Sequence, residues 1–166
     1  MTKQLLSEVL REALEFSESR KSLLLSTVDS DGLPHASYAP FVRNASGDFY
    51  ILVSELSSHT EFLARGNASI LLIEDESDAS QIFARTRVSF HCTVQFVERH
   101  SEVWSEKVDA MQLRHGAIIE TLVSLADFRM CRLIPDNGRY VRGFGQAYNI
   151  DPAFSTIDHI DKDDLK

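Results

Sequence analysis

Residues 22–53, SLLLSTVDSDGLPHASYAPFVRNASGDFYILV, decide the fold class. Three runs rich in apolar residues, Ser22–Val28, Leu33–Arg43 and Phe49–Val53, are separated by short segments of Asp, Asn, Ser and Gly, which are typical of turns. Connections this short leave no room for the helical crossover that joins parallel strands. The stretch therefore predicts an antiparallel meander of three strands.

The flanking sequence adds helices and further strands. Apolar residues recur at helical spacing over residues 3–19, and Ser58 and Glu61 have the spacing of a capping box that opens a short helix. The other predicted elements are strands at Ala68–Ile73 and Gln81–Val97, a helix at Ser101–Leu125 broken at Gly116, and a hairpin of Phe128–Ile134, a turn at Pro135–Gly138, and Arg139–Phe144. About seven strands without βα alternation favour an α+β fold, an antiparallel barrel with flanking helices.

Length and composition limit the domain count and the function classes. The 166 residues fit one domain, which we expect over residues 1–150, followed at 151–166 by an acidic tail that is ordered only where it docks. A net charge of −8 disfavours nucleic-acid and anionic-membrane binding but allows a local basic pocket. No signal-peptide pattern and no apolar run of ~18 residues precedes or interrupts this domain, so we expect a cytoplasmic protein.

Two clusters have the chemistry of an anion site. Arg85 and Arg87 are two residues apart in a predicted strand, so both guanidiniums would project from one face and suit a phosphate or carboxylate. The alternative is that they pair with the acidic loop at 74–78. His59 lies with Thr60 in the first turn of the predicted short helix, where free backbone N–H groups bind anions. The alternative there is an exposed polar turn.

Two further residues are candidates for positioning or metal binding. His159 lies between Asp158 and Asp161, and a carboxylate can orient an imidazole and raise its basicity as a ligand; the alternative is a solvated histidine. Asp127 opens a predicted strand, where the alternative is an ordinary helix-to-strand boundary. No GxSxG, SxxK, P-loop or HExxH motif supports a hydrolase or a kinase.

Several blocks of sequence together carry a family resemblance. Besides Leu24–Arg43 and Phe49–Leu63, they are IEDESDASQIFARTRVSF at 73–90, Asp127–Phe128 and RGFGQAY at 142–148. Over residues 10–150 the chain resembles the heme-utilisation proteins of the HugZ/HutZ type, which belong to the pyridoxamine-5′-phosphate-oxidase-like, FMN-binding split-barrel superfamily. The resemblance implies a split barrel that works as a homodimer, with ligands in grooves at the dimer interface.

The resemblance also implies roles for individual residues. Flavin members hold the FMN phosphate at positions that match Ser54, His59, Thr60, Arg85 and Arg87. The heme branch binds heme between protomers and degrades it with oxygen and electrons from a donor still to be identified. Its basic residue near the heme matches Arg85 or Arg87, and the Asp that supports the axial ligand matches Asp127.

The axial ligand itself is the point at which the sequence departs from the family. The family's ligand is a histidine near the C-terminus, where this chain has Asp163–Lys166, and His159 is the imidazole nearby. Taken over residues 10–150, the resemblance implies heme binding with oxygen-dependent heme degradation. An FMN-binding oxidoreductase and a non-catalytic heme carrier are the alternatives.

Overall fold

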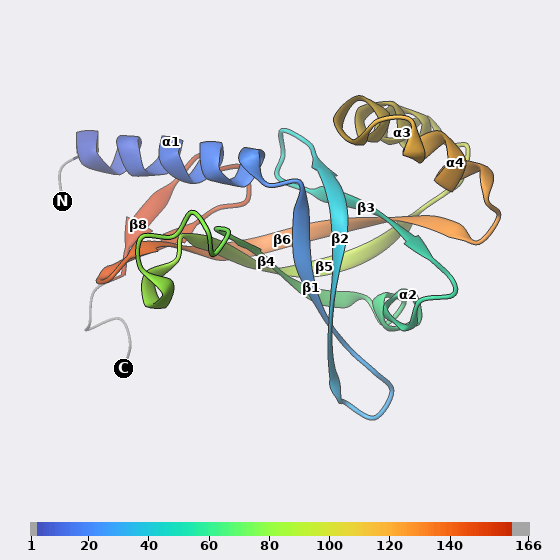
Figure 1. Ribbon diagram of the computed structural model, residues 1–166, viewed down its shortest axis with the longest axis horizontal. Helices are drawn as coiled ribbons and strands as arrows, with labels where there is room; N and C mark the ends of the chain where they lie inside the picture. The colour runs from blue at the N-terminus through green and yellow to red at the C-terminus, as the bar shows by residue number, and fades with distance from the viewer. Residues whose placement is uncertain (1–2, 161–166) are drawn as a thin grey trace.

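The computed structural model describes residues 3–160, which form eight strands, four α-helices and one 3-10 turn (Figure 1). The elements are α1 (Lys3–Ser19), β1 (Ser22–Val28), β2 (Pro34–Arg43), β3 (Phe49–Ser54), α2 (Ser58–Leu63), β4 (Asn67–Ile73), the 3-10 turn η1 (Ile82–Ala84), β5 (Arg87–Val97), α3 (Glu102–His115), α4 (Ile118–Ser124), β6 (Phe128–Gly143), β7 (Gln146–Ile150) and β8 (Ile157–His159).

The strands form one antiparallel sheet that closes on itself. Their order is β3-β2-β1-β4-β5-β6-β7-β8, and β3 also pairs with β6, so that β1 to β6 make a closed barrel of six strands. The predicted α+β fold with an antiparallel barrel and flanking helices is confirmed. The meander also has the predicted order, with β1 paired to β2 and β2 paired to β3. Its first turn is closed by the Asp29 carboxylate, which accepts the backbone N–H groups of Asp31 and Leu33.

The predicted hairpin over residues 128–144 is wrong, because these residues form one 16-residue strand, β6. Pro135 lies where the register between β5 and β6 shifts, opposite Cys92, and a bulge of this kind tolerates a proline. A Cβ at Gly138 would lie 2.4 Å from the Phe90 ring, so this glycine permits a close approach within the sheet and makes no turn. Pairing with β5 thus overrides a local turn signal.

Two other local predictions also differ from the structure. The strand expected from Gln81 begins at Arg87, because η1 intervenes and the Gln81 side chain accepts the Phe83 backbone N–H. The capping box expected from Ser58 is not formed: α2 has Ser57 at its N-cap, without a side-chain cap hydrogen bond. By contrast, Gly116 breaks the long helix between α3 and α4 as predicted, with a φ of 85°.

The folded unit runs past residue 150, the expected end of the domain. The segment at 151–160, expected to belong to an acidic tail, forms a turn and then β8, which pairs with β7. Phe154 and Ile157 are buried in the main core, and this apolar contact explains why the segment docks despite its charge. The rest of the expected tail, 161–166, lies outside the described residues.

The helices cover the two ends of the elongated molecule (Figure 1). At one end, α1 buries Val9 and Ala13 in the main core and packs Phe16 against Tyr140 of β6, with ring centroids 6.4 Å apart. At the other end, α3 and α4 bury Trp104 and Ile119 in a second cluster against β3 and the start of β6. Between Lys3 and Ile160, no helix is long and apolar enough to cross a membrane.

Candidate functional site

Four candidate residues meet where α2 follows β3, and we call Ser54, His59, Thr60 and Asp127 the α2 group. The Ser54 hydroxyl donates to the Asp127 carboxylate at 2.6 Å. The Asp127 backbone carbonyl accepts from Glu55 N–H, and the Thr60 hydroxyl donates to the Ser54 carbonyl at 2.5 Å. These bonds tie the end of β3, the start of α2 and the residue before β6 into one unit.

His59 contacts a residue that the sequence analysis did not select. Its Nδ1 lies 3.1 Å from the hydroxyl of Ser37 on β2. Burial, followed by the nearby His35, lowers the pKa of His59, so the imidazole is uncharged at neutral pH. His59 can therefore give or accept a hydrogen bond but supplies no charge for an anion. The sequence feature that could have pointed to Ser37 is its two-residue spacing from His35, which places both side chains on one face of β2.

The other three candidates, Arg85, Arg87 and His159, lie at the far end of the sheet, and we call them the β5 group. Arg85 follows η1 and so does not share a strand face with Arg87. Its Nε donates to the Glu74 carbonyl at 2.8 Å, and its guanidinium pairs with Glu76 at 3.4 Å. The alternative of pairing with the acidic loop is thus the one that the structure shows for Arg85.

Arg87 differs from Arg85 in having its charge available. Its Nη1 donates to the Arg85 carbonyl at 2.9 Å, and among residues 3–160 it forms no ion pair with a carboxylate. A half-buried guanidinium without an acidic partner is suited to an anionic ligand. Of the two predicted arginines, the geometry favours Arg87 for this role.

His159 ends β8, the last strand of the sheet. Its ring packs edge-on against Tyr148 with centroids 5.2 Å apart, and its Nε2 lies 3.2 Å from the Gly145 carbonyl oxygen. Three strand spacings, from β5 to β8, put it about 14 Å across the sheet from Arg87. Among the described residues no three His, Cys, Asp or Glu side chains gather as a metal site, so metal binding here would rest on a single imidazole.

The two groups lie at opposite ends of β6. Ser54 pairs with residue 128 of β6, whereas Arg87 pairs with residue 141. At ~3.3 Å per residue, these positions are about 40 Å apart along the strand. In Figure 1, α2 and β8 likewise lie toward opposite ends of the molecule. One copy of the chain therefore cannot bring both groups to one small ligand.

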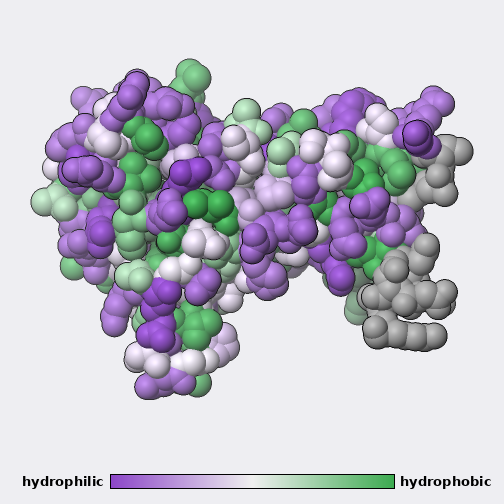
Figure 2. Space-filling model, turned by 180° about the vertical axis from the view of Figure 1, so that it is seen from behind, coloured by the Kyte–Doolittle hydropathy of each residue, from purple (hydrophilic) through white to green (hydrophobic). Residues whose placement is uncertain are grey.

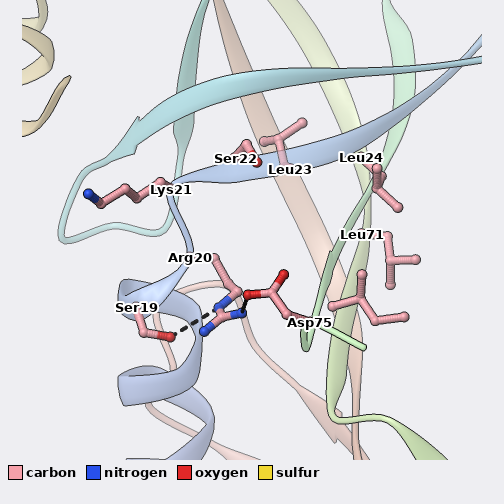
Figure 3. Close-up of a pocket in the computed structure, with 9 residues that line it drawn as sticks. Ser19, Arg20, Lys21, Ser22, Leu23, Leu24, Leu71 and Asp75 are labelled. Carbon is pink, nitrogen blue, oxygen red and sulfur yellow. Dashed lines mark hydrogen bonds and ion pairs between the residues drawn. The ribbon is translucent and has the colours of Figure 1, made fainter. Parts of the chain in front are cut away.

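An exposed apolar surface lies on the outer face of β1, β2 and β4. Leu24 pairs with Tyr38 on one side and Leu71 on the other, and Leu24 and Tyr38 are 48% and 66% exposed. Beside them a cavity of about 390 Å³ has Leu24 and Leu71 on one wall and the Arg20–Asp75 ion pair, at 3.2 Å, on the other (Figure 3). From behind, the β1–β2 hairpin projects from the body and also shows hydrophobic residues (Figure 2).

Comparison with known proteins agrees with this architecture. The profile of the pyridoxamine 5′-phosphate oxidase family matches residues 9–142. The chain belongs to this family. It is 45% identical over 140 residues to the heme oxygenase HutZ of Vibrio cholerae, covering 84% of this chain and 79% of that protein. The resemblance to proteins of the HugZ/HutZ type is thereby confirmed.

Solved structures of the same fold include two relatives that are more than 30% identical to this chain. A crystal structure of HutZ, described as the heme storage protein of Vibrio cholerae, matches with a TM-score of 0.77 and 41% identity, covering 81% of this chain and 96% of that one. ChuZ of Campylobacter jejuni matches with a TM-score of 0.83 and 34% identity, covering 93% of this chain and 63% of that one. One relative is thus named an oxygenase and, in its crystal structure, a storage protein.

Proposed function

We propose that this protein binds heme in a groove formed by two copies of the chain and degrades it with oxygen and an external electron donor. The observation that carries the proposal is the separation of the α2 group from the β5 group along β6. Each group holds part of what heme binding needs, and about 40 Å lies between them in one copy. The names of the relatives at 45% and 41% identity, a heme oxygenase and a heme storage protein, support heme as the ligand.

A two-fold homodimer would join the two groups. In a symmetric dimer, any contact of the α2 end of one copy with the β5 end of the other occurs twice, so it creates two equal sites. The outer face of β1, β2 and β4 is apolar enough for such an interface, and Phe83 in η1, 84% exposed, adds to it. The same apolar side chains would cover the heme macrocycle.

Three residues would share the recognition of heme. Arg87 has no acidic partner among the described residues and would pair with a propionate. His159 would supply the imidazole for the iron. Asp127 already accepts a hydrogen bond from Ser54, and its remaining lone pairs can accept an N–H from the imidazole of a second copy. Such a bond would orient the ring and raise its basicity as a ligand.

A hemin titration followed by absorbance tests the proposal. We expect a Soret band that saturates at one heme per chain and that His159→Ala removes. The control is His100→Asn, at an exposed histidine whose φ of 66° asparagine tolerates. Light scattering should give about twice the chain mass of 18.7 kDa. A monomer would contradict the site formed by two copies. A Soret band unchanged in His159→Ala would contradict His159 as the iron ligand.

Turnover separates an enzyme from a carrier. With oxygen and a chemical reductant, we expect the Soret band to decay and the heme ring to be opened, because the site would hold the iron through one imidazole and leave the opposite face to oxygen. The Asp127→Asn variant should bind heme, but its Soret band should decay more slowly than that of the unmodified chain. A Soret band that stays intact under these conditions would assign the protein to heme storage.

FMN is the second candidate ligand, because the family profile over residues 9–142 is that of pyridoxamine 5′-phosphate oxidase. Ser54, Thr60, His59, Arg85 and Arg87 would then contribute to a phosphate site. The hydrogen bonds of Ser54 with Asp127 and of Thr60 with the Ser54 carbonyl, and the pairing of Arg85 with Glu76, leave Arg87 as the main cation for it. A parallel titration with FMN decides: stoichiometric FMN binding without a saturable heme signal would replace the heme proposal.

A further inference from the structure

A second cavity, lined by two arginines, lies outside the two groups. It has a volume of about 550 Å³ and lies between the end of α1, the β2–β3 turn and the end of α3. Figure 1 shows that turn between α1 and α3. Its wall includes Ser17, Glu18, Phe41, Arg43, Ala45 and Arg114. We call it the Arg43–Arg114 cavity.

Two guanidiniums line this cavity without an acidic partner. The Nη2 of Arg43 donates to the Pro152 carbonyl at 2.6 Å, and the Nη2 of Arg114 donates to the carbonyls of Glu18 and Arg20 at 2.7 and 2.6 Å. Neither arginine forms an ion pair with a carboxylate anywhere in residues 3–160. Two half-buried like charges on one cavity wall repel each other unless an anion lies between them.

The polar atoms that lack partners are concentrated at the same place. Ser17 is fully buried, and its hydroxyl has no hydrogen-bond partner. The Nε atoms of Arg43 and Arg114 are also buried without a partner. Buried side-chain donors are nearly always satisfied, so three such atoms around one cavity need an explanation. The Nε–H of each arginine is therefore a donor without a partner, whereas the Nη2 of Arg114 already gives both its protons to the carbonyls of Glu18 and Arg20.

Aromatic contacts hold both guanidiniums in place. Arg43 lies over the Phe154 ring, 4.6 Å from its centroid, and Arg114 lies over Phe41 at 5.6 Å. Burial lowers the pKa of Arg43, and the nearby carboxylate of Glu18 is the largest influence that opposes this. An anion bound in the cavity would act in the same direction as Glu18 and favour the charged guanidinium. Glu18 is a carboxylate on the cavity wall, but among residues 3–160 it forms no ion pair with either arginine, so both guanidiniums can still pair with a bound anion.

We propose that the Arg43–Arg114 cavity binds the phosphate or carboxylate group of a small molecule, at a site separate from the heme groove. The separation follows from β2, on which Phe41 and Arg43 alternate with Tyr38 and Pro40. The first two face inward and line this cavity, whereas Tyr38 belongs to the exposed outer face.

Binding of inorganic phosphate to the full chain tests this proposal. At constant ionic strength set with chloride, equilibrium dialysis with radiolabelled phosphate should show one saturable site per chain. Arg43→Gln should weaken binding tenfold or more. Ala45→Asp, which places a carboxylate at the exposed rim without touching the core, should weaken it at least threefold. The control, Arg65→Gln, removes the same charge from an exposed arginine and should bind as the unmodified chain does.

Three outcomes would overturn the proposal. One is phosphate binding that does not saturate; a second is equal binding in Arg43→Gln, Ala45→Asp and the control. If Arg43→Gln fails to fold, Ala45→Asp alone decides the second outcome. The third is displacement of phosphate by one equivalent of hemin, which would make the cavity part of the heme groove. Competition by glycerol phosphate and by acetate then tells whether a phosphoryl or a carboxylate group is preferred.

Discussion

The two ends of β6 hold their polar side chains in different ways. In the α2 group, Ser54, Thr60 and Asp127 hydrogen-bond to one another or to adjacent backbone, so these bonds fix their positions at the end of β3. In the β5 group, Arg85 depends on the acidic loop and His159 on β8, a three-residue edge strand. The α2 group is thus held by hydrogen bonds at the end of a barrel strand. In the β5 group only Arg87 lies on a barrel strand, β5, whereas Arg85 and His159 lie in a loop and in an edge strand.

This difference suggests a division of labour in the proposed dimer. A group fixed by internal hydrogen bonds can orient a ligand without further ordering, whereas edge strands and loops lose conformational freedom when they close on a partner. We therefore expect substitutions in the α2 group to act mainly on stability and on the geometry of the iron ligand. Those of Arg87 and His159 in the β5 group should act mainly on affinity.

The largest effect should come from breaking the strand that joins the two ends. In Gly138→Ala, the new Cβ would lie 2.4 Å from the Phe90 ring and 2.7 Å from the Ser89 carbonyl oxygen, and backbone must move to relieve it. We expect a loss of about 3 kcal/mol in the free energy of unfolding, measured by urea denaturation. Gly143→Ala is the control, because its Cβ would meet nothing closer than 3.4 Å. Equal stability of the two variants would show that β6 is not continuous at residue 138.

A smaller effect should follow within the α2 group. Ser54→Ala leaves the Asp127 carboxylate without its 2.6 Å donor, and we expect the free energy of unfolding to fall by about 1–3 kcal/mol. Ser57→Ala, at an N-cap without a side-chain hydrogen bond, should change it by less than about 0.5 kcal/mol. A double-mutant cycle of Ser54→Ala with Asp127→Asn checks the contact, since additive effects would mean that the two side chains do not interact.

The two arginines of the β5 group separate affinity from stability. Arg87→Ala should weaken hemin binding about tenfold, or about 1.4 kcal/mol, with little change in urea denaturation, because Arg87 has no acidic partner to lose. Arg85→Ala should lower stability more than affinity, because its contacts with Glu74 and Glu76 hold the loop before β5. Equal losses of affinity and stability in Arg87→Ala would make that arginine structural.

How far the sequence predicts the molecule depends on the range of the interactions. The meander, the break at Gly116 and the closed barrel follow from local turns and alternating apolar residues, and these predictions are confirmed. The hairpin at residues 135–138 failed because the pairing of β6 with β5 outweighs a Pro-Asp-Asn-Gly turn signal. The partnership of Ser54 with Asp127, 73 residues apart, leaves no local pattern, so only the fold reveals it.

The smallest effect concerns the loop that leads into β8. Partial burial acts to raise the pKa of Asp151, but hydrogen bonds from Thr156 and Ser155 outweigh it, so the pKa lies below its ordinary value. A carboxyl whose pKa is lower in the folded state stabilises that state at pH values above about 4, the usual pKa of an unfolded Asp, and loses this contribution as the pH falls through the folded pKa. We therefore expect Asp151→Asn to have a lower free energy of unfolding than the unmodified chain at pH 7, with the difference narrowing below about pH 4.

Asp158→Asn is the matched control, because no hydrogen bond to the exposed Asp158 carboxylate is found in the described chain. A gap that stayed constant with pH would mean that the asparagine alters the loop by its shape, and β8 would then be held by Phe154 and Ile157 rather than by the charge at its entrance.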